Sequence, residues 1–63
     1  MMERKDGFLI FKNSFGYYEC ININHIVTIY LNEDNEFVIC TVLMRHYISN
    51  VDNISLHDFI SKF

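Results

Sequence analysis

Residues 21–43 constrain the fold most, because apolar side chains occupy both parities of a strand repeat on either side of one polar turn, residues 32–36. The two parities of the first strand are Val27, Ile29 and Leu31 against Ile26, Thr28 and Tyr30. A half-solvated antiparallel sheet instead alternates apolar with polar residues. The pattern therefore predicts a hairpin that is apolar on both faces and needs a cover on each.

The chain is too short to cover both apolar faces of this hairpin with its own residues. Its 63 residues make one domain, 1–63, and a domain of this size buries only about 60% of the surface that its unfolded chain exposes. Such domains depend on disulfides, a metal or oligomerisation, and only two cysteines are present. We therefore predict that a second copy supplies the missing cover, which makes the protein a homo-oligomer.

The strand candidates are rich in β-branched and aromatic residues and are bounded by turn residues. They cover residues 8–12, 17–23, 26–31, 37–43 and 46–48. Gly16 can take the positive φ that the first turn needs. We expect a short corner at Asn24-His25 and a tight bend near Met44-Arg45. The predicted fold is α+β and mainly β, an antiparallel meander of four or five strands with a short C-terminal helix.

The helix is predicted from a stripe of apolar residues. At ~100° per residue, one side of the tail carries Leu56, Phe59, Ile60 and Phe63. We expect the helix to run from about Leu56 to the C-terminus, with an alternative start at Asn50. Residues 1–6 are mostly charged and are expected to be loose.

Composition and motifs argue against several classes of function. A net charge of -3 provides no basic patch for nucleic acid, and the apolar runs are shorter than the ~18 residues of a membrane-spanning helix. A basic segment followed by an apolar one does not open the chain, so we expect a cytoplasmic protein with reduced thiols. Nucleophile elbows, glycine-rich phosphate loops and His-Glu-x-x-His pairs are absent from the sequence. We therefore expect no enzymatic activity and no cofactor.

Two cysteines and two histidines form the one set that could bind a metal. A closed zinc site of two cysteines and two histidines would use Cys20, His25, Cys40 and His46. Their spacing matches no recognised zinc framework, and a free cysteine in a strand behaves as a small hydrophobe. We favour packed thiols and surface histidines over the metal, and keep a zinc-stapled binder as an alternative.

Several short features occur in an order shared with a known family. They are Gly16-Tyr17-Tyr18, an Ile23-Asn24-His25-Ile26 corner, Ile29, a strand near residues 38–42, and Tyr47-Ile48-Ser49 before a terminal helix. In these features residues 17–60 resemble the small cytoplasmic proteins of the FlbD type, found in flagellar operons, and similar bacterial or phage proteins. The sequence departs from their pattern at Met44-Arg45, where a glycine-containing turn is expected, and at residues 49–52, where an acidic helix start is expected. The resemblance implies a β-meander with a terminal helix and no active site.

Our first hypothesis is a non-enzymatic interaction module that self-associates through an apolar sheet face. The residues expected in that contact are Ile26, Thr28, Tyr30, Val38, Cys40 and Val42. The alternative is a small binding or inhibitory protein, for example one of phage origin, that acts on a host protein or nucleotide. It would present the acidic turn and the aromatic surface to that heterologous partner.

Overall fold

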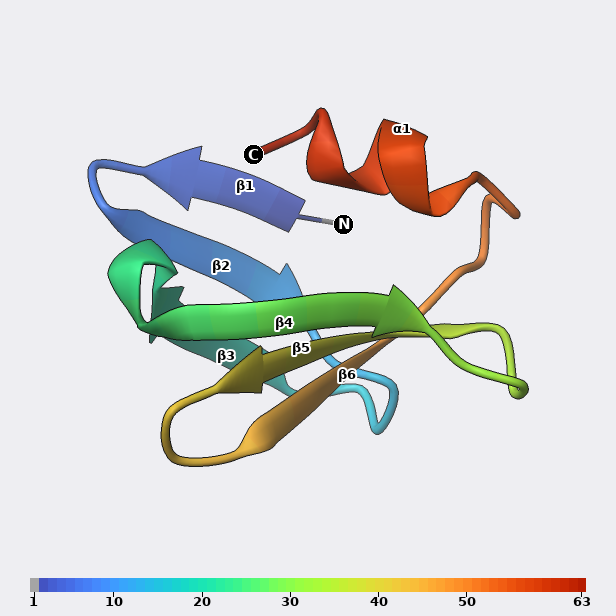
Figure 1. Ribbon diagram of the computed structural model, residues 1–63, viewed down its shortest axis with the longest axis horizontal. Helices are drawn as coiled ribbons and strands as arrows, with labels where there is room; N and C mark the ends of the chain where they lie inside the picture. Colours follow the sequence, from blue (N-terminus) through green and yellow to red (C-terminus); the bar gives the residue numbers. More distant parts are fainter. Residues whose placement is uncertain (1) are drawn as a thin grey trace.

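The computed structural model describes residues 2–63, which form two antiparallel three-stranded sheets and one short helix (Figure 1). Sheet A contains β1 (Met2–Lys5), β2 (Phe8–Lys12) and β3 (Tyr18–Asn22). Sheet B contains β4 (Ile26–Leu31), β5 (Glu36–Thr41) and β6 (Arg45–Ser49), and α1 (Leu56–Ile60) follows. The predicted class, mainly β with a short C-terminal helix, is confirmed. The predicted single meander is corrected to two sheets.

A short corner divides the chain into these two sheets. The 3-10 turn η1 (Ile23–His25) lies where the corner was predicted, and the Asn22 side chain accepts a hydrogen bond from the backbone N–H of Asn24 (2.9 Å). The meander prediction has β4 paired with both β3 and β5. Because η1 redirects the chain, β4 does not pair with β3, whereas the predicted hairpin with β5 is confirmed, in a register that joins Tyr30 to Val38.

Most of the N-terminal segment that was expected to be loose, residues 1–6, forms a strand within the described part of the chain. Residues 2–5 form β1 and pair with β2, with Met2 opposite Phe11. The Met2 side chain packs against the core, and the Arg4 guanidinium donates to the Phe63 carbonyl (2.9 Å). These partners are remote in sequence, so the charged segment gave no local sign of a strand. Met1 lies outside the described residues.

The bend between β5 and β6 closes without a glycine. The Thr41 hydroxyl accepts from the backbone N–H of Met44 (3.2 Å), and the backbone N–H of Thr41 donates to the Met44 carbonyl (2.9 Å). Hydrogen bonds of Thr41 thus close the bend where a glycine-containing turn was expected from the family resemblance. As a result the bend lies at residues 42–44, and Arg45 begins β6.

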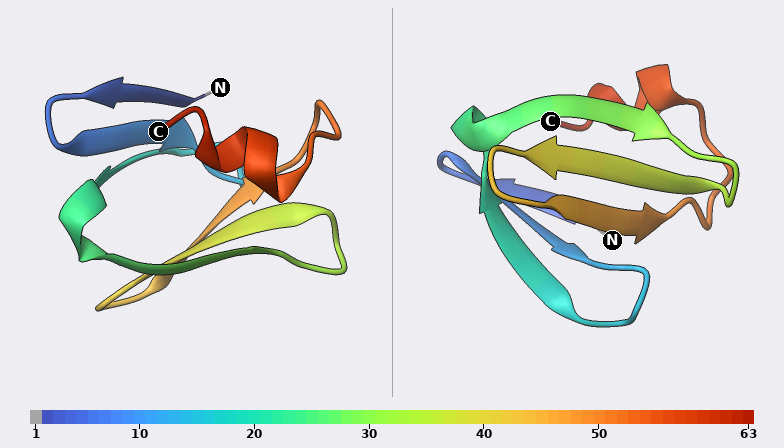
Figure 2. Two further views of the ribbon diagram at one scale, coloured as in Figure 1. Left: turned by 45° about the horizontal axis from the view of Figure 1, so that its top comes forward. Right: turned by 60° about the horizontal axis from the view of Figure 1, so that its bottom comes forward.

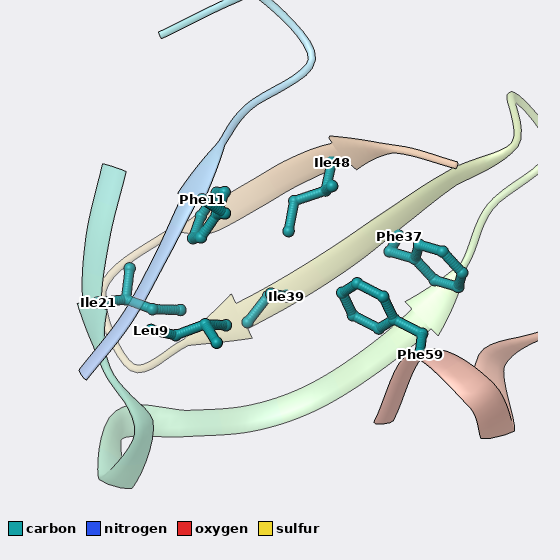
Figure 3. Packing of buried hydrophobic residues seen from close by; sticks show 7 residues of the cluster. All are labelled: Leu9, Phe11, Ile21, Phe37, Ile39, Ile48 and Phe59. Carbon is teal, nitrogen blue, oxygen red and sulfur yellow. The ribbon is translucent and has the colours of Figure 1, made fainter. Parts of the chain in front are cut away.

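The core lies between the sheets (Figure 3). Sheet A contributes Leu9, Phe11 and Ile21, and sheet B contributes Phe37, Ile39 and Ile48. Alternation along each strand sends these side chains to one face. The inward face of each sheet therefore covers the other.

The helix α1 closes one end of this sandwich. Phe59 stacks on Phe37, with ring centroids 3.9 Å apart and an interplanar angle of 7°. The Ser55 hydroxyl caps the helix by accepting from the backbone N–H of Asp58 (3.1 Å). The predicted start at Leu56 is therefore confirmed over the alternative at Asn50. Asn50 is buried, and its amide bonds both backbone groups of Ile54 (2.9 and 3.0 Å), which orders the connection before the helix.

We predict that Phe59→Ala lowers the free energy of unfolding by about 3–5 kcal/mol, the usual cost of emptying a buried phenylalanine site. The ring packs between Phe37 and Phe63, and five helical residues cannot hold a helix without such packing. Urea unfolding would measure the change. Phe15→Ala is the matched control, because Phe15 is 79% exposed and its loss should cost less than about 0.5 kcal/mol. Equal stability of the two variants would contradict the role given to Phe59.

Candidate self-association surface

The outward face of sheet B is the candidate site. Alternation places the side chains that do not enter the core on this face. We call it the tyrosine face, and it consists of Thr28, Tyr30, Val38, Cys40, Arg45 and Tyr47. In the right-hand view of Figure 2 no other strand or helix lies over these three strands. Within residues 2–63 no strand or helix therefore forms a second layer here, and only the turn between β2 and β3 reaches the Glu36 end, where Ser14 bonds Ser49 and Glu36.

Two tyrosines flank the centre of the tyrosine face. Val38 is paired across β4 with Tyr30 and across β6 with Tyr47, and its side chain is 0% exposed. Val38 is outside the core cluster between the sheets, so the groups that cover it lie on the outward side of sheet B, where its two cross-strand neighbours are tyrosines. Tyr30 itself remains 37% exposed. The face is therefore a partly self-covered aromatic surface and not a bare aliphatic one.

Four of the six residues predicted for the contact lie on the tyrosine face, namely Thr28, Tyr30, Val38 and Cys40. The other two do not. A bulge between Ile26 and Thr28 shifts the register, so Ile26 packs against the core. Val42 lies in the exposed bend after β5. Parity counting failed for Ile26 because one extra residue reverses the face of everything before it.

Opposite charges mark the two ends of the tyrosine face. At one end, a side-chain hydrogen bond with Tyr47 and the two nearby tyrosines raise the pKa of Arg45. At the other end lies Glu36, on the same parity as Val38, and hydrogen bonds from Asn32 and Ser14 lower its pKa. Both groups are therefore charged near neutral pH. The face has a positive end at Arg45 and a negative end at Glu36.

The four potential metal ligands do not form a metal site. Cys20, His25 and His46 border one shallow hollow of about 200 Å³, whereas Cys40 lies on the tyrosine face. Within residues 2–63 there is no group of three His, Cys, Asp or Glu side chains placed to hold a metal ion. The expectation of packed thiols and surface histidines is reversed in part, because Cys20 is exposed and His46 is buried. Strand alternation turns Cys20 outward on β3 and His46 inward on β6.

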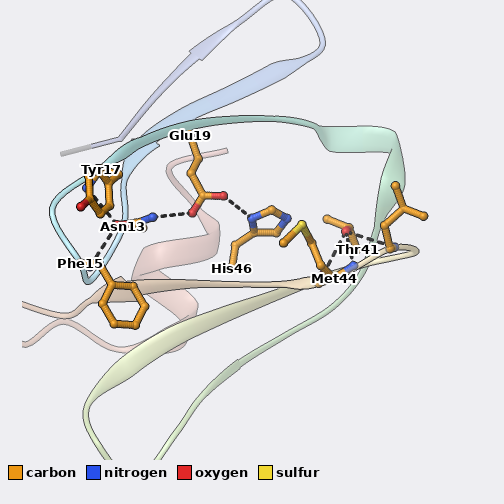
Figure 4. A network of polar contacts seen from close by, with 8 residues as sticks. Asn13, Phe15, Tyr17, Glu19, Thr41, Met44 and His46 are labelled. Carbon is orange, nitrogen blue, oxygen red and sulfur yellow. Dashed lines mark hydrogen bonds and ion pairs between the residues drawn. The ribbon is translucent and has the colours of Figure 1, made fainter.

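His46 belongs to a polar network that sequence reasoning missed (Figure 4). Its Nδ1 lies 2.8 Å from Glu19 Oε1, and the other carboxylate oxygen accepts from the Asn13 side-chain amide (2.8 Å). An ionised carboxylate only accepts hydrogen bonds, so Nδ1 carries the proton. Glu19 comes from β3 and His46 from β6, 27 residues apart, and no local sequence signal connects them. The network joins the two sheets beside the Phe11 ring, which meets His46 edge-on.

We predict that Glu19→Ala lowers the free energy of unfolding by about 1–3 kcal/mol, because it leaves two donors without their acceptor. These donors are His46 Nδ1 and the Asn13 side-chain amide. Chemical denaturation would measure the loss. Glu33→Ala, at the exposed tip of the β4–β5 turn, is the control and should change stability by less than about 0.5 kcal/mol. If Glu19→Ala unfolds like the control, the network does not join the sheets.

Comparisons with known proteins identify no relative. No family model, curated protein or solved structure matches the chain with significant similarity. The resemblance to the FlbD type therefore stays a prediction. Among residues 2–63, no helix has the length and apolar character needed to cross a membrane.

Proposed function

We propose that this protein is a non-enzymatic interaction module whose copies associate through the tyrosine face, in the cytoplasm. The observation that carries the proposal is a sheet face that bears two tyrosines around Val38 and has no other strand or helix of the described chain over it. Tyrosine and arginine are the residue types enriched at the energetic centres of protein interfaces. The face offers both.

The charges of the tyrosine face suit a two-fold contact. A two-fold axis that lies in the interface and crosses the strands at right angles reverses the strand direction between copies. It would bring the Arg45 end of one copy to the Glu36 end of the other, and these ends carry opposite charges. Electrostatic complementarity of this kind sets orientation and speeds association. Apolar burial, at about 25 cal/mol per Å², would supply most of the affinity.

We predict that Tyr30→Glu converts a dimer to a monomer, because it would bury a carboxylate in the centre of the contact. Sedimentation at micromolar concentration measures this change. Tyr18→Glu is the matched control, since Tyr18 is 76% exposed on β3 of sheet A and its change should leave the dimer intact. A wild-type protein that sediments as a monomer across the micromolar range would contradict the proposal.

An aromatic loop supports the second candidate function, recognition of a different protein. Phe15 and Tyr17 are largely exposed in the turn between β2 and β3. The Asn13 side chain accepts hydrogen bonds from the backbone N–H groups of both residues (3.0 Å each), and Gly16 has a φ of 91°. An exposed aromatic pair on an ordered turn can bind a partner without a large cost in ordering.

This second function predicts a separable loss. Replacing Phe15 and Tyr17 together by serine should abolish retention of a single dominant foreign protein in affinity capture, while sedimentation still shows the wild-type oligomer. Tyr18→Ser controls for loss of an exposed aromatic outside the turn. Identical capture profiles for wild type and the double variant would remove this candidate.

A further inference from the structure

We infer that a second copy of this chain adds to the free edge of β4, so that two B sheets join into one antiparallel six-stranded sheet. The inference rests on the proposed self-association and adds a second contact to it. Edge pairing has its two-fold axis normal to sheet B, so it leaves the two tyrosine faces side by side and not stacked on each other. The inference follows from the backbone groups of β4, from its exposed side chains and from the charges at its two ends.

The outer edge of β4 has unused backbone groups. The backbone N–H of Asn32 donates to the Glu36 carbonyl across the hairpin (2.9 Å), so the residues of the same parity, Tyr30 and Thr28, direct their backbone groups toward β5. Ile29 and Leu31 then direct theirs away from β5. No backbone or side-chain group in residues 2–63 bonds to them on that side. These N–H and C=O groups can accept another strand.

The edge lacks the features that normally prevent strand addition. Proteins protect edges with charged residues, proline or bulges. β4 is six residues long, contains no charged residue and no proline, and has a bulge only at its start, between Ile26 and Thr28. At its other end Leu31 is 39% exposed. The half of the strand beyond the bulge is therefore open to pairing.

A register centred on Tyr30 satisfies both the backbone and the side chains. In an antiparallel pairing about this residue, Ile29 exchanges two hydrogen bonds with Leu31 of the second copy, and Leu31 does the same with its Ile29. The two Tyr30 side chains meet across the two-fold axis on the outward face. The exposed Leu31 side chain is covered by the half-buried Ile29 of the second copy.

Charge selects the antiparallel arrangement. Glu33 and Asp34 form the acidic tip that follows β4, and His25 lies in the corner that precedes it. Antiparallel pairing places the acidic tip of each copy beside the corner with His25 of the other, and separates the two tips by the length of the strand. Parallel pairing would bring four carboxylates together at one end. Like charges at close range disfavour that alternative.

Amide hydrogen exchange tests the inference on the wild-type protein. The N–H groups of Ile29 and Leu31 should exchange at least about tenfold more slowly when the concentration is raised from low micromolar to near millimolar. A tenfold change corresponds to about 1.4 kcal/mol of protection. The N–H of Tyr30, which points toward β5 in every state, is the internal control and should respond far less.

A pair of lysine variants tests the same contact. Leu31→Lys should raise the dimer dissociation constant at least about tenfold, because lysine on an edge strand opposes pairing. Leu43→Lys is the matched control: Leu43 is 88% exposed in the bend after β5 and should leave the constant unchanged. Circular dichroism confirms that both variants fold.

The outcomes separate this inference from the proposed function. If the wild type forms dimers while exchange at Ile29 and Leu31 is independent of concentration, the β4 edge is overturned and association through the tyrosine face stands. If the wild type stays monomeric at every concentration, both proposals fall. Dimers with slowed exchange at both amides, weakened by Leu31→Lys alone, support the edge contact.

Discussion

The burial of two sheet faces against each other is the constraint on which the rest of this structure depends. Neither three-stranded sheet could hide its apolar side alone, since three strands need a packed face for stability. The aliphatic and aromatic side chains of sheets A and B meet in one core, and Phe59 of α1 closes it by stacking on Phe37. The connections between the elements must then lead the chain into and out of this sandwich.

Polar side chains fix two of these connections by hydrogen bonds. The Asn50 amide orders the connection to α1 through Ile54, and the carboxylate of Glu19 joins His46 to Asn13 across the two sheets. Within residues 2–63, no buried side-chain nitrogen or oxygen lacks a hydrogen-bond partner. In a low dielectric such contacts are strong, and an unpaired group would be costly. These hydrogen bonds therefore help to specify how the sheets are arranged, while burial of the apolar core drives folding.

The surface of sheet B shows how a small domain manages a second apolar face. Two tyrosines lie beside Val38 on this face, and each combines a large apolar ring with a hydroxyl that tolerates water. This arrangement suits a surface that is stable when exposed and still able to associate. The open edge of β4 adjoins this face, so the side chains of one strand can contribute to one contact and its backbone groups to another.

The sequence by itself determined those elements that depend only on residues close together in the chain. The β-branched run of β4, the corner made by the Asn22 side chain and the apolar stripe that ends in Phe59 all follow from neighbouring residues. Most residues of the tyrosine face could likewise be predicted, because side chains alternate along a strand. The bulge beside Ile26 could not, since one extra residue in β4 is visible only against its partner strand.

Only the tertiary structure decided the contacts between segments that are distant in the chain. The order of Met2–Lys5 depends on β2 and on the carbonyl of Phe63, and the contact between Glu19 and His46 joins residues from different sheets. These interactions form between segments that are distant in the chain, and their energies depend on a geometry that no local pattern encodes. The same holds for the division into two sheets, because a three-residue corner separates β4 from β3.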